Sequence, residues 1–381
     1  VWEDDRDMDT EVYYKRSTDG GATWGPDVHV TITAGPQGLP SVAVVSDYVH
    51  VTWADFTLIG NSEIYYGRST DGGATWETPT QISYGAGYSS SPSITAYESD
   101  IHIAWQDSRF AWYNNEIFYR HSSDDGVTWG NESRLTEDTT FSNAPSIGVS
   151  ANYVHVVWEE MRDGNFEIYY KRSTDYGQTW GQDIRLTDDT GESHYPSLAV
   201  SGSNVHIVWI DNRDGNEEIY YKNSIDNGTT WSADTRLTDN MNASQNASLA
   251  VCGEKVHVVW QDDRHTNWEI YYKRNPTGNT YVDEYENARV LQLNLVVSPN
   301  PFSERTTFII NSRSMTINGV LNIYSATGRL VESFRLTPDA LRTTVTWDGT
   351  DQANRSLPSG IYFVQLSADD YVKTKKVLLI R

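Results

Sequence analysis

The sequence predicts an all-β protein in which a six-bladed β-propeller is followed by a small C-terminal β-sandwich. Three observations predict this class. A motif recurs five times at intervals of 51 to 53 residues, each repeat holds four short strand-like segments, and a different β pattern begins after about residue 285. Four-stranded units that recur about every 40–50 residues are typical of propeller blades.

The repeated motif is Ser-x-Asp-x-Gly-x-Thr-Trp, and its tryptophans are separated by 52, 53, 51 and 51 residues. Two further markers accompany it: an alternating apolar run ending in Trp, such as "VHVTW" (49–53), and a segment of the type "EIYY". Because the "EIYY" type of segment occurs six times, the chain contains six repeats. The motif itself spans Ser17–Trp24, Ser69–Trp76, Ser122–Trp129, Ser173–Trp180 and Ser224–Trp231.

Each repeat is expected to form four strands, named A to D. In the second repeat they are "PSVAVVS" (40–46), "YVHVTWAD" (48–55), "EIYYGRS" (63–69) and "TWETPTQIS" (75–83). Apolar residues recur at every second position in these segments, and Gly, Asp, Asn and Pro bound them. The first repeat lacks strand A, and in the last one "RNPTGNT" (274–280) replaces the motif. Two interpretations stay open: the incomplete repeats close the ring together, or the propeller is N-terminally truncated.

The motif lies between strands C and D, so we interpret it as a structural hairpin turn. Its Asp can accept hydrogen bonds from the turn's own backbone, and its Gly permits a positive φ. A catalytic centre is normally unique, whereas this motif occurs five times without a nucleophile beside a base. Strand C takes about six residues, roughly 20 Å. The motifs and the B–C loops must therefore lie on opposite faces, and the D–A connections share the B–C face.

The motif resembles the Asp box, the bacterial neuraminidase repeat (BNR) of sialidase-like propellers, over about 275 residues. The resemblance implies a site on the face away from the boxes. Members of this family use three arginines on the substrate carboxylate, a Tyr nucleophile paired with Glu, and an Asp acid/base. They also commonly carry Arg-Ile-Pro, which does not occur in this sequence. Every evident Glu–Tyr pair belongs to the repeat, so the catalytic residues stay unknown.

Strand B leads into Trp-x-Asp/Glu-x-Arg in five of the six repeats. Acid and Arg two residues apart can pair with each other, and we favour this structural interpretation over a ring of charges that meets a ligand. Asp107 and Arg109 of the third repeat are kept as ligand-binding candidates. The histidines of strand B form a regular column without clustered ligands and are interpreted as structural.

Departures from the repeat supply the remaining ligand-binding candidates. The B–C loops of the second and third repeats, "ADFTLIGNS" and "QDSRFAWYNN", contain aromatic residues, and further aromatic residues follow in later repeats. Aromatic rings in polar loops can stack on the apolar faces of sugars. The alternative is that the rings cap the apolar edges between blades. These candidates are Phe56, Phe110, Trp112, Tyr113, Phe166, His194, Tyr195 and Trp268.

Charge and composition limit the partners. Residues 291–381 hold 10 Lys/Arg and 7 Asp/Glu, so residues 1–290 hold 19 and 45, a net charge of −26. A field of this sign repels phosphate backbones and argues against nucleic acid. No apolar run is long enough to span a membrane. The single cysteine, Cys252, is expected to be buried and excludes an intrachain disulfide or a Cys-based metal site.

Cofactors and metals are not predicted. The acidic D–A loops "TEDTT" (136–140) and "TDDTG" (187–191) could hold Ca²⁺ through clustered oxygens, but we favour solvated charge.

The C-terminal pattern reads as about seven strands over some 85 residues. It resembles the Ig-like C-terminal sorting domain of the type IX secretion system and the related hook-capping Ig-like module. The matching elements are "SPNPF" (298–302), "IYSATGRLV" (323–331), "WDGTD" (347–351), "LPSGIYFVQL" (357–366) and "KTKKVLL" (373–379). The resemblance implies export by that machinery from a Gram-negative-type bacterium, followed by surface display or release.

These observations predict an Asp-box propeller over residues 1–285, a linker over 286–296 and an Ig-like sorting domain over 297–381. We expect a monomer that binds an extracellular glycan or glycoprotein on the face opposite the boxes. Two alternatives stay open: a glycoside hydrolase of exo-sialidase type, and a surface scaffold that binds proteins.

Overall fold

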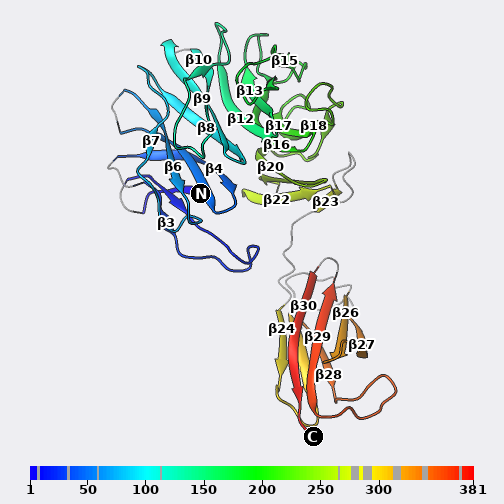
Figure 1. Cartoon of the computed structure of the whole chain (residues 1–381). Coiled ribbons are helices and arrows are strands. Elements are labelled where there is room, and N and C mark those ends of the chain that lie inside the picture. The colour runs from blue at the N-terminus through cyan, green and yellow to red at the C-terminus, as the bar shows by residue number, and fades with distance from the viewer. Residues whose placement is uncertain are drawn as a thin grey trace. The chain divides into compact units, whose positions relative to one another are not determined.

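The computed structural model describes residues 1–6, 9–31, 35–57, 60–111, 114–264, 267–275, 283–285, 294–311, 319–336, 342–368 and 371–381. The chain forms two compact units, Val1–Tyr285 (unit 1) and Glu286–Arg381 (unit 2). All regular elements in the described ranges are strands, as Figure 1 shows. Among these residues, none forms a helix of the length and hydropathy needed to cross a membrane.

Unit 1 contains six antiparallel sheets in its described residues, one of three strands and five of four, and each is built from consecutive strands of the chain. Their order in each four-stranded sheet is A-B-C-D, as expected from the repeat. The strands of sheets 1 to 3 are β1 (Trp2–Asp4), β2 (Glu11–Tyr14) and β3 (Val28–His29); β4 (Gln37–Val45), β5 (Tyr48–Asp55), β6 (Glu63–Ser69) and β7 (Thr80–Gln81); and β8 (Ser89–Tyr97), β9 (Asp100–Ala111), β10 (Asn114–Ser122) and β11 (Ser133–Arg134).

Sheets 4 to 6 repeat the same arrangement. Sheet 1 lacks strand A, whereas sheet 6 has a fourth strand although its sequence has no box. The strands are β12 (Ser142–Ser150), β13 (Tyr153–Glu160), β14 (Glu167–Ser173) and β15 (Ile184–Arg185); β16 (Ser193–Ser201), β17 (Asn204–Asp211), β18 (Glu218–Ser224) and β19 (Thr235–Arg236); and β20 (Ser244–Cys252), β21 (Lys255–Asp262), β22 (Glu269–Arg274) and β23 (Asp283–Tyr285).

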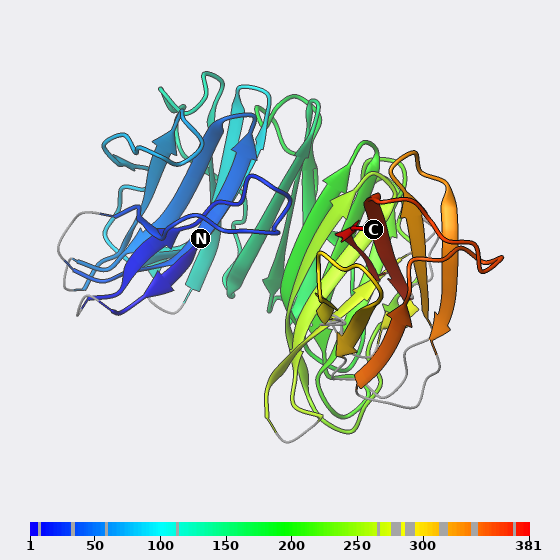
Figure 2. The same cartoon turned by 90° about the horizontal axis from the view of Figure 1, so that it is seen from below.

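The A strands are the inner strands of unit 1. Strands β4, β8, β12, β16 and β20 contact one another in this order, and Figure 1 shows them around a common centre with strands C and D farther out. Viewed from below, the sheets of unit 1 follow one another in chain order (Figure 2). A side chain directed toward strand D therefore points to the rim.

Consecutive sheets bury an apolar layer between them, which we call a seam. At the seam of sheets 3 and 4, Ile117 and Tyr119 pack with Val156 and Trp158 in one buried cluster. Full burial of one such aliphatic side chain contributes roughly 1.5–3 kcal/mol. The outer side of sheet 6 differs, because Ile270 is 73% exposed while its equivalents in sheets 2 to 5 are fully buried.

The Asp boxes and the B–C loops lie at opposite ends of the sheets. In sheet 3 the box residue Asp125 donates its backbone N–H to the carbonyl of Ser99, in the turn between strands A and B. At the other end of sheet 4 the B–C loop residue Asn165 binds the carbonyl of Asp189 in the D–A connection, at 3.1 Å. We call these ends the box face and the loop face of unit 1.

Each Asp box is a closed hydrogen-bonded turn. In the third box Ser122 donates to Asp124 at 2.8 Å and accepts from the backbone of Gly126 at 2.9 Å. Asp124 also accepts from the backbone and the hydroxyl of Thr128, at 2.8 and 2.6 Å. The hydroxyl of Thr128 is the first cause of the lowered pKa of Asp124. The acid is thus fully used inside its own turn, which supports the structural interpretation.

The boxes also join neighbouring sheets. Tyr119 of sheet 3 meets Trp180 of the next box edge-on, with ring centroids 5.0 Å apart. Gly177 of that box has φ +81°, and a Cβ there would lie 1.9 Å from the Tyr119 hydroxyl. Glycine is therefore required twice, by its backbone angle and by the space that Tyr119 occupies. The same Tyr–Trp contact recurs at the seams of sheets 1–2, 2–3 and 4–5.

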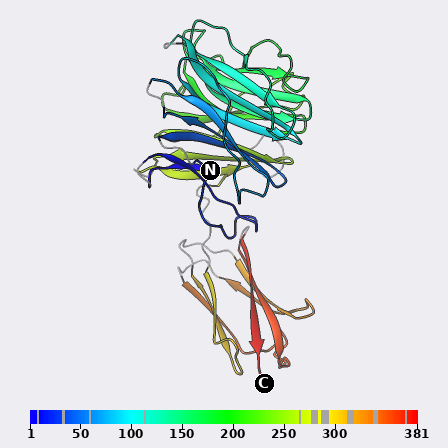
Figure 3. The same ribbon diagram turned by 60° about the vertical axis from the view of Figure 1, so that its left-hand side comes forward.

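Unit 2 is a two-layer β-sandwich in its described residues, with sheet orders β24-β25-β28 and β27-β26-β29-β30; both layers are visible in Figure 3. Its core gathers Phe308, Leu321, Trp347 and Val364. The strands are β24 (Asn294–Ser298), β25 (Thr306–Asn311), β26 (Gly319–Ser325), β27 (Leu330–Leu336), β28 (Arg342–Trp347), β29 (Gly360–Ala368) and β30 (Tyr371–Leu379).

The expectation of a buried Cys252 is wrong, because this thiol is exposed. Cys252 is the last residue of β20 and pairs with Lys255 across the A–B turn. The apolar residues before Cys252 belong to the inner strand β20, but Cys252 itself lies at the exposed end of the β20–β21 hairpin.

Candidate functional site

The arginines after strand B are held within their own sheets. Arg109 donates to both oxygens of Asp107, at 2.9 and 2.6 Å, and to Glu132 at 2.6 Å. Its guanidinium lies 4.3 Å from the ring centroid of Phe118. Arg213 makes the same contacts with Asp211, Asp234 and Tyr220.

This pairing explains the ionisation of the buried acid and the direction of the arginine. Burial alone would raise the pKa of Asp107, but the hydrogen bonds from Arg109 outweigh it and lower the pKa. Glu132 stands beside the outer strand β11, so Arg109 is directed to the rim. Asp107 and Arg109 are therefore paired with each other, in agreement with the structural interpretation, and their role as ligand-binding candidates stays a prediction.

The glutamates of the "EIYY" segments are also structural in their contacts. Glu167 is buried and accepts from Thr187 at 2.5 Å, Arg185 at 2.8 Å and Asn165 at 2.9 Å. These bonds tie the B–C loop to strand C and to the segment after strand D. Glu116 and Glu218 bind Arg134 and Arg236 in the same way. The carboxylates of Glu116, Glu167 and Glu218 thus bind side chains of their own sheets.

The histidines of strand B form buried or partly buried pairs with tyrosines of strand C. His155 Nδ1 lies 2.7 Å from the Tyr170 hydroxyl, and burial lowers the pKa of His155 to about 3. The same pair recurs as His50–Tyr66, His102–Tyr119, His206–Tyr221 and His257–Tyr272. Within the described residues, no group of three or more His, Cys, Asp or Glu could hold a metal ion.

The sheets differ from one another where the seams reach the loop face. At three seams a residue at the start of strand C, or directly before it, meets the second residue of the next strand A. Asn115 donates to Asn143 at 2.7 Å, and Glu217 binds Gln245. At the seam between sheets 4 and 5 the pair is aromatic: the rings of Phe166 and His194 are 4.7 Å apart.

Every complete A strand has a β-bulge beside this position, and the bulged residue has a positive φ. These residues are Leu39, Ser91, Ala144, Tyr195 and Asn246. In sheet 5 the bulge shifts the register between His194 and Ser197, as at the equivalent positions of the other sheets. Since the A strands are innermost, the bulges lie toward the centre of the loop face.

Four residues meet at the aromatic seam, and we call them the Tyr195 cluster: Glu159, Phe166, His194 and Tyr195. Tyr195 has φ +50° and is 56% exposed. Glu159, which is buried, accepts from the Tyr195 backbone at 3.0 Å and lies 3.2 Å from His194 Nδ1. The ring of Tyr195 is 5.9 Å from that of His194. An exposed aromatic ring is thus presented on a backbone that a buried acid holds in place.

The charge state of His194 follows from its acidic neighbours. Burial alone would lower the pKa of His194, but the hydrogen bond to Glu159 and the charges of Glu159 and Glu192 outweigh it and raise the pKa. Glu192 lies 3.4 Å from Nε2. The imidazole therefore stands between two carboxylates.

The structure brings Phe166, His194 and Tyr195 together and places three other candidates elsewhere. Phe56 packs against the apolar cluster of sheets 2 and 3, as the capping interpretation expects. Phe110 is 58% exposed, but Arg134 covers its ring at 4.3 Å. Trp268 is 49% exposed, at the position in sheet 6 that Phe166 has in sheet 4. Trp112 and Tyr113 lie outside the described residues.

Sequence reasoning missed Glu159 and Glu192. Glu159 lies within strand B between Trp158 and Glu160, where other repeats have Glu3, Ala54, Gln106, Ile210 and Gln261. Glu3 accepts the equivalent backbone bond from Leu39, at 3.0 Å. An acid at this variable position, followed one repeat later by a His and an exposed Tyr, was the available signal. Glu159 was not recognised because its neighbour Glu160 is the acid of the recurrent ion pair.

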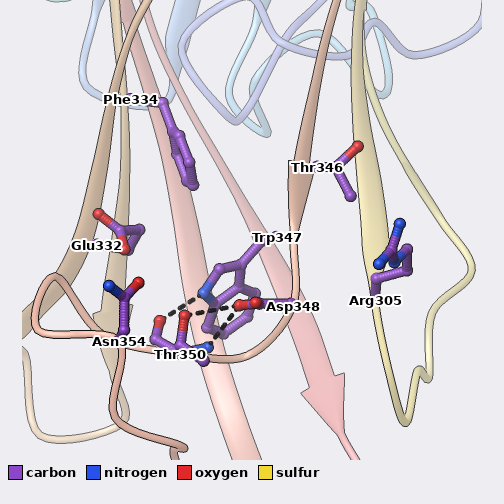
Figure 4. Close-up of a pocket in the computed structure, with 8 residues that line it drawn as sticks. All are labelled: Arg305, Glu332, Phe334, Thr346, Trp347, Asp348, Thr350 and Asn354. Carbon is purple, nitrogen blue, oxygen red and sulfur yellow. Dashed lines mark hydrogen bonds between the residues drawn. The ribbon is translucent and has the colours of Figure 1, made fainter.

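Two hollows are lined by residues that do not belong to the loop face. One, of about 530 Å³, is lined by Tyr14, Arg16, Trp24 and Gly73 on the box face, where Trp24 is 60% exposed. The other, of about 300 Å³, lies in unit 2 (Figure 4). There the Trp347 indole donates to the Thr350 carbonyl at 2.8 Å, and Thr350 donates to Asp348 at 2.7 Å. These contacts close a turn at one side of the hollow, and Arg305, Glu332 and Asn354 also line it.

Comparison with known proteins supports the fold class. The family model of the FlgD Ig-like domain matches residues 303–371. A sialidase from Clostridium perfringens is 24% identical over 270 residues, which make up 62% of this chain and 61% of that protein. The chain thus spans less than two thirds of the length of this relative.

A solved structure with a TM-score above 0.5 supports the fold. A protein of unknown function from Dyadobacter fermentans aligns with a TM-score of 0.51 at 12% identity, over 82% of this chain and 94% of that chain. A Hadza microbial sialidase aligns with a TM-score of 0.49 at 19% identity, over 66% of this chain and 57% of that chain. The all-β class and the Ig-like C-terminal domain are confirmed, and the chain is similar in sequence to a sialidase.

Proposed function

We propose that unit 1 binds an extracellular glycan on its loop face. The observation that carries the proposal is the Tyr195 cluster: an exposed ring, fixed through its backbone by buried Glu159, beside Phe166 and His194. Aromatic rings beside hydrogen-bonding groups suit the mixed apolar and polar surface of a sugar. Similarity to a sialidase supports a glycan as the ligand class.

The arginines favour binding over sialoside hydrolysis as the proposed activity. Arg109, Arg162 and Arg213 each bind at least two carboxylates of their own surroundings. An arginine engaged in this way offers little to a substrate carboxylate, because its partners would first have to be released. The alternative, an exo-sialidase type of hydrolase, draws its support from the sequence similarity alone.

A glycan array tests the proposal on the full chain, with Tyr195→Ala and Tyr176→Ala compared. Tyr176 is 41% exposed and lies in an Asp box, on the opposite face. The expected result is binding by the wild type and by Tyr176→Ala, with a loss of at least tenfold in Tyr195→Ala. Equal binding by all three would place the site elsewhere.

A fluorogenic sialoside assay runs beside the array. Steady turnover that one Tyr→Phe change abolishes would favour the hydrolase instead. Binding of a protein without any glycan signal would favour the scaffold.

We also propose that the six sheets are six blades of one propeller. The recurrent seam contacts and the central A strands support this count. A crystal structure of the full chain counts the blades directly, and a ring with another number would overturn the proposal.

We propose that unit 2 is a sorting domain that directs the protein to type IX secretion, followed by surface display or release. The matching family model and the sequence elements at 298–379 support an Ig-like module of this kind. Deleting residues 297–381 in a host with that machinery is expected to leave the protein inside the outer membrane. Unchanged export would contradict this role.

A further inference from the structure

We infer that the Tyr195 cluster binds an uncharged sugar and discriminates against sialylated and sulfated ones. The inference rests on the proposed function and deepens it by naming the class of glycan. It follows from three features of the loop face: the charge of the cluster, the engagement of the nearby arginines, and the chemistry of the adjoining seams.

The cluster itself carries negative charge. Glu159 and Glu192 flank His194 at 3.2 and 3.4 Å, so even a protonated imidazole leaves one negative charge in excess. Glu159 is buried, with 7% of its side chain exposed, and water screens it little. A ligand carboxylate or sulfate at Tyr195 would face this negative charge.

The arginines that approach this end of the sheets already hold carboxylates. Arg162, in the B–C loop of sheet 4, binds Asp138, Glu160 and Asp183 at 2.7 to 3.1 Å. Arg185 of the same sheet binds Glu167 at 2.8 Å and Asp188 at 3.0 Å. Arg213 of sheet 5 pairs with Asp211 and Asp234. On either side of the cluster, these cations are neutralised by the protein itself.

The adjoining seams offer neutral or acidic groups. Toward sheet 3 the residues are Asn115 and Asn143, whose amides bind each other at 2.7 Å. Toward sheet 6 the pair is Glu217 and Gln245, which adds a further carboxylate. Amides and carboxylates are good acceptors for sugar hydroxyls, and the ring of Tyr195 can cover a C–H face. The whole surface suits a polyol without acidic substituents.

The repeat supplies controls that keep the fold intact. Gln106 occupies the position of Glu159 in sheet 3 and makes the same bond, from the Ala144 backbone at 2.8 Å. Ala144 in turn occupies the position of Tyr195, with φ +49°. Glu159→Gln and Tyr195→Ala therefore recreate side chains that the fold already accepts at this place.

The experiment measures affinity of the full chain for a panel of neutral oligosaccharides, each paired with its sialylated or sulfated derivative, by isothermal titration calorimetry. The wild type is expected to bind a neutral member at least tenfold more tightly than its acidic partner. Glu159→Gln should reduce this ratio at least threefold, and Tyr195→Ala should weaken both members at least tenfold. Tyr176→Ala on the box face should match the wild type.

The outcomes separate this inference from the proposed function. Equal or tighter binding of the acidic member would overturn the inference and leave glycan binding standing. A preference for the neutral member that Glu159→Gln does not change would also overturn it, because the discrimination would then arise elsewhere. No binding to any member of the panel would instead contradict the proposed function.

Discussion

The box face and the loop face of unit 1 use the same repeat in opposite ways. On the box face, five turns repeat the same Ser–Asp–Thr hydrogen bonds, and four of them receive a Tyr from the preceding sheet. On the loop face, the equivalent seam pairs are two amides, an aromatic pair, and an acid with an amide. The box-face residues that join neighbouring sheets are therefore the same at these four seams, whereas the residues at the loop-face ends of the seams differ between repeats.

The largest effect is expected from filling the space behind a box. Gly177→Ala places a methyl group against the Tyr119 hydroxyl at a positive φ, so we expect a loss of about 3 kcal/mol in unfolding free energy. Gly164→Ala, in the B–C loop of sheet 4, has φ +97° but nothing within 4 Å and should lose about 1 kcal/mol. Urea denaturation measures both, and equal losses would show that the box seam is not tightly packed.

Removing a box tryptophan should distinguish paired from unpaired boxes. Trp180→Ala deletes the edge-on contact with Tyr119 and is expected to lose about 2–3 kcal/mol. Trp24→Ala removes a ring that is 60% exposed and should lose less than about 1 kcal/mol. If thermal unfolding shows the same loss for both, Trp24 is covered in solution and the first box is a seam like the others.

Acid should weaken the seams through their buried histidines. Burial lowers the pKa of His102 and His155 to about 3, below the value of about 6.5 in the unfolded chain. The unfolded state therefore binds more protons, and stability falls as pH drops below about 6.5, by about 1–2 kcal/mol for each histidine at pH 5.

Two controls accompany this measurement. His155→Gln should show a smaller difference between pH 7 and pH 5 than the wild type in urea unfolding. His194 on the loop face has the opposite sign: its raised pKa stabilises the fold at low pH, and this contribution is lost as pH rises through that pKa. His194→Gln should therefore steepen the loss of stability toward acid, and a shallower loss would contradict the assignment.

The smallest effect on stability is expected on the loop face. Tyr195→Ala should change the unfolding free energy by less than about 0.5 kcal/mol, because the side chain is 56% exposed and the backbone bond to Glu159 remains. A loss above about 2 kcal/mol in thermal unfolding would mean that Tyr195 is a packing residue, and the division between the two faces would fail.

The fold was largely predictable because every seam repeats the same physical requirements. Alternation in strand B buries Trp158, and the box leaves its Asp and Gly in fixed places, so five copies reinforce one another. The site was predictable only in part. Phe166, His194 and Tyr195 stood out as departures from the repeat, and the structure brings them together.

The rest depends on contacts between repeats, which a single repeat does not reveal. Glu159 acts through the backbone of Tyr195, 36 residues later and in the next sheet. Arg109 binds both Asp107 and Glu132, which directly precedes strand β11 of the same sheet. The burial of Cys252 was mispredicted because an apolar run does not show where its hairpin ends.

The β-bulge of strand A presents a different side chain at the same position of sheets 2 to 6 in unit 1. Leu39, Ser91, Ala144, Tyr195 and Asn246 share the same left-handed backbone, so the fold accepts side chains of different size and polarity at this position. Replacing one of these residues would change one position around the centre of the loop face without altering the Asp boxes on the opposite face. A new specificity could thus be installed one position at a time, for example by moving the tyrosine from sheet 5 to the alanine of sheet 4.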